Sequence, residues 1–133
     1  MIKNLNKDNL ELIKDSFLDE KTVLNDLNTN PFAKYLILLE NDKVIGYLYY
    51  SDIYERAEIN QIEILEIHRN CGKASLLLGE LIKNVDKDIT LEVKKDNYPA
   101  VRLYEKFNFK QVAIRKGYYQ GIDGILMERK KDS

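Results

Sequence analysis

Residues 61–85 read Gln-Ile-Glu-Ile-Leu-Glu-Ile-His-Arg-Asn-Cys-Gly-Lys-Ala-Ser-Leu-Leu-Leu-Gly-Glu-Leu-Ile-Lys-Asn-Val, and this segment decides the fold. Polar and apolar residues alternate over residues 61–67, which is typical of a half-buried strand. Apolar residues then recur at helical spacing over residues 76–85. A short basic turn that contains a glycine lies between them. The segment therefore predicts a strand, a tight turn and a helix in direct succession.

The turn has the features of an anion-binding site. The first N–H groups of a helix have no partners inside the helix, and the helix dipole is positive there. Gly72 has no Cβ, so a phosphate can approach the backbone closely. Ala74 is nearly as small, and Arg69 and Lys73 add positive charge. We therefore expect a phosphate or pyrophosphate at this turn; the alternative is an ordinary helix N-terminus with a convenient glycine.

The composition is that of one globular domain, which we expect to span residues 1–133. Apolar residues make up 44% and charged residues 32%, and 133 residues are too few for two ordinary domains. The net charge of −1 gives no basic field for nucleic acid, and no window reaches the length of a membrane span. One cysteine allows no internal disulfide, and residues 1–8 lack the apolar core of a signal peptide. These features predict a cytoplasmic protein.

The other segments predict a mixed α/β fold. Strands are expected at residues 2–5, 35–39, 44–50, 89–93, 109–114 and 122–127. Helices are expected from Leu10 to Phe17, from Asp19 to Leu27, and after Asn97. Residues 54–57 and 117–121 read as links, and the charged tail at residues 129–133 is expected to fray. The prediction is one mixed sheet of six to seven strands with about four helices.

Several motifs resemble those of the GNAT acetyltransferases. The pattern Arg69-x-x-Gly72-x-Ala74 is similar to the loop that binds the pyrophosphate of acetyl-CoA in that family. The run from Leu91 to Phe109 resembles the Leu-Glu-Val…Asn…Ala…Leu-Tyr…Phe block of the bacterial ribosomal-protein-alanine N-acetyltransferases (RimI type). Residues 114–119 and 123–127 resemble the ending of the same group. The resemblance covers residues 58–129; residues 1–57 agree in element order alone, and Asn108 and Gly124 stand where that group usually has glycine and alanine.

The resemblance implies an acetyl-CoA site and a set of roles. The pyrophosphate would lie in the loop formed by Arg69, Asn70, Cys71, Gly72, Lys73, Ala74 and Ser75. The pantetheine arm would pair with the backbone of Ile62, Glu63 and Ile64, and Asn97 would contact the cofactor. Glu92 would accept a proton from the amine, and Tyr104 would give one to the CoA thiolate.

Each of these roles has a structural alternative. Glu92 points away from Leu91 and Val93, so it is either a base on a partly buried face or a solvent-facing strand residue. Tyr104 is either a general acid or a core aromatic, and Asn97 can also cap a helix. Tyr118 and Tyr119 either line a peptide groove or pack on the sheet as hairpin aromatics. His68 is the single histidine, which excludes a dedicated histidine metal cluster.

The resemblance implies acetyl transfer to a protein N-terminus, with the terminal alanine of a small-subunit ribosomal protein as acceptor. Two alternatives remain: a GNAT enzyme for another peptide or small amine, and a CoA-binding module without turnover. A nucleotide-binding protein is excluded because the loop lacks the Gly-Lys-Ser/Thr ending of a P-loop. We expect direct transfer, no bound metal, no nucleic-acid or membrane partner, and a monomer or weak dimer.

Overall fold

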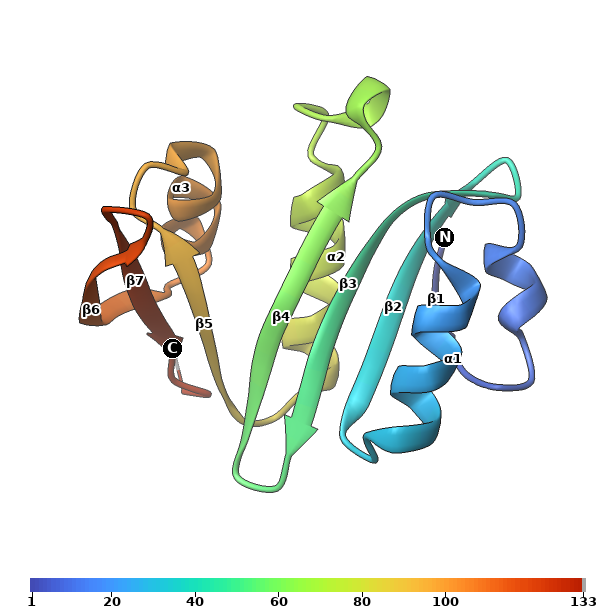
Figure 1. Cartoon of the computed structure of the whole chain (residues 1–133), viewed down its shortest axis with the longest axis horizontal. Coiled ribbons are helices and arrows are strands. Elements are labelled where there is room, and N and C mark those ends of the chain that lie inside the picture. Colours follow the sequence, from blue (N-terminus) through green and yellow to red (C-terminus); the bar gives the residue numbers. More distant parts are fainter. Residues whose placement is uncertain (133) are drawn as a thin grey trace.

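The computed structural model describes residues 1–132, which form a seven-stranded sheet with helices on both faces (Figure 1). The strand order is β1-β2-β3-β4-β5-β7-β6. The strands are β1 (Ile2–Leu5), β2 (Ala33–Glu40), β3 (Lys43–Ile53), β4 (Arg56–Ile64), β5 (Asp88–Lys94), β6 (Lys110–Tyr119) and β7 (Ile122–Arg129). The helices are α1 (Glu20–Thr29), α2 (Lys73–Asn84) and α3 (Tyr98–Lys106), with 3-10 turns η1 (Leu10–Ile13) and η2 (Glu66–His68). The predicted mixed α/β class is confirmed.

A β-bulge opens the middle of the sheet. Strands β4 and β5 run parallel and pair over residues 56–59 and 88–91. Opposite β3, the register of β4 shifts between Tyr49 and Tyr50, which leaves Asn60 as an extra residue in β4. A bulge bends its strand, and beyond it β4 diverges from β5 (Figure 1). The sheet is therefore open where the loops after β4 and β5 begin.

Separate hydrophobic cores cover the two faces of the sheet. Helix α2 buries Leu77, Leu78 and Leu81 completely in the larger core, because their spacing places them on one helical face. On the opposite face, Ile13 of η1 and Val23 of α1 are buried in a smaller core. The strands that carry the site are thus packed from both sides.

The predicted helix from Leu10 to Phe17 is wrong, because only η1 forms there. The side chain of Asn9 donates to the Asn4 carbonyl (2.9 Å) and accepts from the Asn6 N–H (2.7 Å), so it closes a loop instead of capping a helix. This leaves three α-helices of 9 to 12 residues within residues 1–132, where about four were expected. None of the helices in this described part of the chain has the length and apolar character needed to cross a membrane.

Two predicted links are shorter than expected. Strand β4 begins at Arg56 and ends at Ile64, so the predicted link at residues 54–57 is reduced to a tight turn. Strand β6 continues to Tyr119, so most of the predicted link at residues 117–121 belongs to the sheet. Asn108 has a φ of 71°, the left-handed conformation that glycine would adopt most easily.

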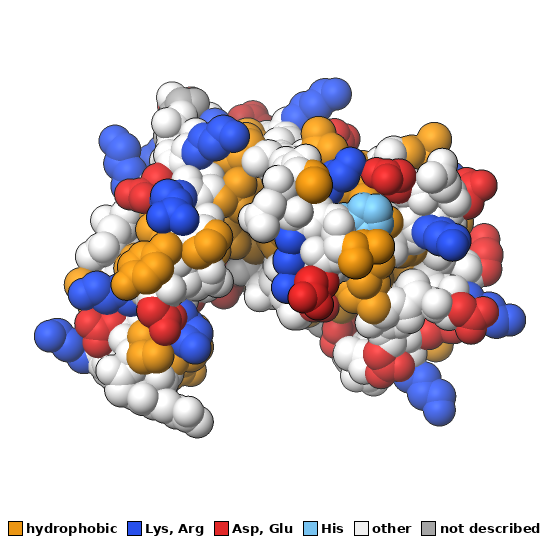
Figure 2. Space-filling view, turned by 90° about the horizontal axis from the view of Figure 1, so that it is seen from above, with side chains coloured by type: hydrophobic (Ala, Val, Ile, Leu, Met, Phe, Trp, Pro, Cys, Tyr) orange, Lys and Arg blue, Asp and Glu red, His pale blue; other side chains and the backbone are white. Residues whose placement is uncertain are grey.

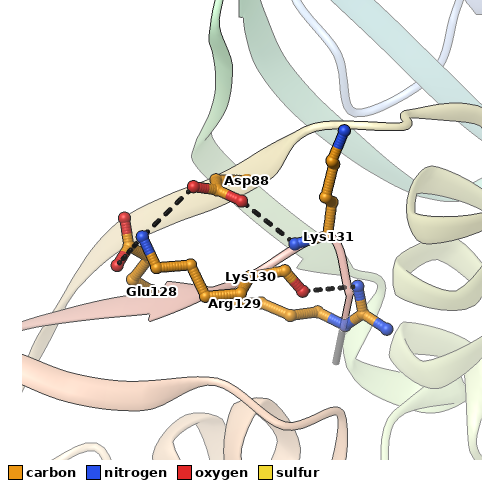
Figure 3. Close-up of polar contacts among 5 residues, drawn as sticks. All are labelled: Asp88, Glu128, Arg129, Lys130 and Lys131. Carbon is orange, nitrogen blue, oxygen red and sulfur yellow. Dashed lines mark hydrogen bonds and ion pairs between the residues drawn. The ribbon is translucent and has the colours of Figure 1, made fainter.

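The end of the described chain is fixed to β5 (Figure 3). The Asp88 carboxylate accepts a hydrogen bond from the backbone N–H of Lys131 (3.0 Å) and lies 3.3 Å from Lys130 Nζ. Arg129 donates through Nε to the Phe107 carbonyl (3.0 Å). The predicted fraying is therefore wrong for residues 129–131, and Ser133 lies outside the described residues.

Candidate active site

A cavity of about 340 Å³ opens between the diverging ends of β4 and β5 and the first turns of α2 and α3. Figure 2, which views this end of the molecule, shows hydrophobic side chains gathered in the hollow between the two halves of the sheet. The lining includes most of the residues predicted from the sequence: Ile62, Ile64, Arg69, Asn70, Gly72, Lys73, Ala74, Ser75, Asn97 and Tyr104. His68, Pro99, Ala100 and Leu103 also line the cavity and were not predicted.

Two predicted cofactor residues do not line the cavity. The Glu63 side chain points to the opposite face of the sheet, where its Oε2 accepts from the Tyr47 hydroxyl (3.3 Å). The backbone of Glu63 nevertheless runs between Ile62 and Ile64. The predicted pairing with the pantetheine arm involves this backbone and not the side chain. Cys71 is exposed, and its thiol donates to the Arg69 carbonyl (Sγ to O, 3.4 Å).

The loop before α2 and the first turn of this helix line the cavity. Gly72 has a φ of 76°, and an added Cβ would meet no atom within 4 Å, so the left-handed backbone rather than crowding favours glycine. The first helical bond runs from Leu76 N to Gly72 O (3.2 Å). The N–H groups of residues 73–75 therefore have no partner within the helix, which suits an anion.

Two basic side chains of this loop are held by other parts of the protein. Arg69 donates through Nε to the Ile64 carbonyl (2.9 Å), which fixes the loop to the end of β4. Lys73 Nζ lies 3.0 Å from Glu40 Oε2, and this hydrogen bond lowers the pKa of Glu40. Both cations thus lie near the N-terminus of α2.

Helix α3 contributes a cap and a buried phenol. Asn97 Oδ1 accepts from the Ala100 N–H (3.4 Å), so Asn97 caps α3 while it lines the cavity. Tyr104 is 8% exposed, and its ring packs against Phe109 with centroids 5.6 Å apart. Burial raises the pKa of Tyr104 to about 12, so the phenol is protonated at neutral pH. Tyr104 is thus a core aromatic that also lines the cavity, with its phenol protonated at neutral pH.

Glu92 lies on the face of β5 opposite the buried Leu91 and Val93, as the alternation predicts. Its side chain is 21% exposed, and its Oε2 forms an ion pair with Arg115 Nε (3.1 Å). The face is therefore partly buried, which the role of a base requires. Arg115 was not given a role from the sequence, although it stands in the quoted ending motif.

Tyr118 and Tyr119 lie beside Glu92 and Arg115, and these four residues form a second cluster. None of the four lines the cavity. Burial and then the charge of Glu92 raise the pKa of the Tyr119 hydroxyl. The two tyrosine rings meet edge to face with centroids 5.0 Å apart. Tyr118 is exposed, and the Arg115 guanidinium lies over its ring, 4.0 Å from the centroid. The structure thus brings both tyrosines to Glu92.

Comparison with known proteins shows which family the chain belongs to. Residues 2–109 match the acetyltransferase (GNAT) family. An N-alpha-acetyltransferase of Saccharolobus solfataricus is 35% identical over 113 residues, which cover 71% of this chain and 68% of that protein. The ribosomal protein bS18-alanine N-acetyltransferase of Haemophilus influenzae is 37% identical over 104 residues, which cover 74% of this chain and 70% of that protein. The crystal structure of the ribosomal-protein-S18-alanine N-acetyltransferase of Escherichia coli superposes with a TM-score of 0.81 at 25% identity, over 98% of this chain and 92% of that one. The chain therefore belongs to the acetyltransferase (GNAT) family and is an N-acetyltransferase.

Proposed function

We propose that this enzyme transfers the acetyl group of acetyl-CoA to the N-terminal alanine of a ribosomal protein in the cytoplasm. The observation that carries the proposal is the cavity between α2 and α3, which gathers an anion-binding loop and a protonated tyrosine. GNAT acetyltransferases use acetyl-CoA. The alanine and the ribosomal partner rest on the bacterial relatives, because the archaeal relative carries the broader name N-alpha-acetyltransferase.

In this proposal the cofactor lies along the cavity, from the loop to the open edge of β4. The pyrophosphate would accept from the N–H groups of residues 73–75, beside Arg69 and Lys73. The pantetheine amides would pair with residues 62–64 as an added strand. These residues pair with β3 on one side, and within residues 1–132 their pairing with β5 has already ended. Asn97 would contact the cofactor from the start of α3.

The reaction needs a proton acceptor for the amine and a proton donor for the thiolate. The amine nitrogen attacks the thioester carbonyl, the carbon–sulfur bond breaks, and the amide forms. Glu92 takes the proton of the amine, directly or through a water, and Tyr104 gives its hydroxyl proton to the sulfur. An α-amino group has a pKa near roughly 7.7–8.0, against about 10.4 for lysine, so a carboxylate base suits an N-terminus better. Transfer is direct, and the chain acts as a monomer or weak dimer.

The test is a thiol-release assay with acetyl-CoA and three peptides. One begins with a free alanine, the second is the same peptide with a blocked N-terminus, and the third offers only a lysine amine. Release of CoA with the first peptide alone supports N-terminal acetylation. Equal release with the lysine peptide contradicts α-amino specificity. A chain that binds CoA in a thermal-shift assay but acetylates no peptide points to a small amine or to a non-catalytic module.

A further inference from the structure

One oxygen of Glu92 is buried without a hydrogen bond. Within residues 1–132, Oε2 is the one buried side-chain oxygen or nitrogen of a non-exposed residue that lacks a hydrogen-bond partner. Arg115 Nε lies only 3.1 Å away, so the two groups form an ion pair in which the N–H does not point along a hydrogen bond. The Tyr119 hydroxyl interacts with the same carboxylate, and burial and then this carboxylate raise its pKa, but Oε2 itself is left without an aligned donor. Such an oxygen is costly when buried, which marks the position for a better-aligned donor.

The guanidinium of Arg115 lies in a position that also suits other cations. Its guanidinium lies between the Glu92 carboxylate and the face of the Tyr118 ring, 4.0 Å from the ring centroid. A carboxylate beside an aromatic face binds cations. Arg115 itself is weakly held, because its side chain is 47% exposed and exposed ion pairs contribute little. Because the Arg115 side chain is partly exposed, the guanidinium can move from this position into solvent.

We propose that Arg115 is an internal placeholder for the acceptor's ammonium group. The N-terminal ammonium displaces the guanidinium, donates an N–H to Glu92 Oε2 and lies against the Tyr118 ring. An ammonium is compact and carries three donors, so it can align with the buried oxygen where the guanidinium does not. Arg115 thus competes with the acceptor and lowers its apparent affinity. This inference rests on the proposed function.

The kinetic test is Arg115→Ala, with Lys116→Ala as the matched control. Lys116 carries the same charge, is the next residue in β6 and is exposed, so its removal reproduces the change in net charge. For a peptide that begins with alanine, Arg115→Ala should lower KM roughly two- to fivefold, the range of an exposed ion pair, with kcat and the KM for acetyl-CoA unchanged. Lys116→Ala should leave all three constants unchanged. An unchanged or higher peptide KM, or a lower kcat that Arg115→Lys restores, would make Arg115 a substrate-binding or positioning residue and overturn the proposal.

A spectroscopic test does not depend on turnover. The Nε–H signal of Arg115 in a ¹⁵N NMR spectrum, assigned with Arg115→Lys, is followed while the alanine peptide is added to the protein saturated with CoA. The free peptide should shift this signal, and the same peptide with an acetylated N-terminus should not. A shift with neither peptide, or with both, contradicts the proposal. Failure of the wild-type enzyme to acetylate any peptide counts against the proposed function, whereas turnover with an unmoved Arg115 signal counts against the placeholder alone.

Discussion

The substitution Tyr104→Phe separates the two roles of this residue, because it removes one hydroxyl and keeps the ring. The ring is 8% exposed and packs on Phe109, so the packing survives and we expect the free energy of unfolding to change by less than about 1 kcal/mol. If the hydroxyl protonates the thiolate, kcat should fall by roughly 10²–10⁴-fold, or about 2.7–5.5 kcal/mol of transition-state stabilisation.

The pH dependence follows from the raised pKa of Tyr104. With a folded-state pKa of about 12 against an ordinary 10.0, only about one molecule in 10⁴ is ionised at pH 8, so the acid form is always available. Because the pKa is raised, this form is lost only as the pH approaches 12. The wild-type rate should therefore show no alkaline decline from Tyr104 below about pH 10.

The assay is thiol release at saturating acetyl-CoA, with Tyr50→Phe as the matched control. Tyr50 is 7% exposed in the same core, burial raises its pKa as well, and it does not line the cavity. Tyr50→Phe should keep turnover within about twofold. If Tyr104→Phe does the same, Tyr104 is a core aromatic and the assignment of the acid is refuted.

Three further changes test other parts of the structure. Glu92→Gln should lower kcat by roughly 10²-fold or more with unchanged acetyl-CoA affinity in calorimetry, because Glu92 lies outside the cavity lining; an equal loss of both would show a structural residue. Gly79→Ala should stabilise the protein by about 0.5–1 kcal/mol in urea unfolding, since the added Cβ meets only a Phe107 carbon at 4.0 Å; destabilisation would contradict that open space. The backbone N–H of Lys131 holds the pKa of Asp88 below its ordinary value, so the stability Asp88 contributes is present above about pH 4 and lost as the pH falls. The difference between wild type and Asp88→Asn in unfolding experiments should therefore shrink at pH 3; a constant difference would show that the charge of Asp88 is not involved.

The loop before α2 could be predicted because its residues are consecutive. Gly72 and the basic residues beside it indicate the loop. The spacing of the leucines in α2 indicates which face of the helix is buried. Tyr104 and Glu92 were found through the motif that contains them. Local pattern and the motif were thus enough to predict most of the residues that line the cavity.

The bulge in β4 could not be predicted, because it changes the phase of the pattern. Before Asn60 the residues packed in the larger core are Ala57 and Ile59, at odd positions; after it they are Ile62 and Ile64, at even positions. A strict alternation therefore detects only one half of the strand. The opening of the sheet depends on this one extra residue, so the shape of the cavity came from the structure alone.

Glu92 and Arg115 lie on strands that are separated in the sheet by β7, and β7 follows both residues in the sequence. Strand β7 lies between β5 and β6, so the two side chains start from strands about 10 Å apart. They meet over Gly124, the cross-strand partner of Arg115, where an added Cβ would lie 2.7 Å from Glu92 Oε2. A side chain at this position would push against the end of the Glu92 side chain, so the glycine leaves room for the carboxylate where it now lies beside Arg115. Gly124, which stands where the resembled group usually has alanine, is therefore the residue that leaves space for the Glu92 carboxylate at the proposed acceptor site.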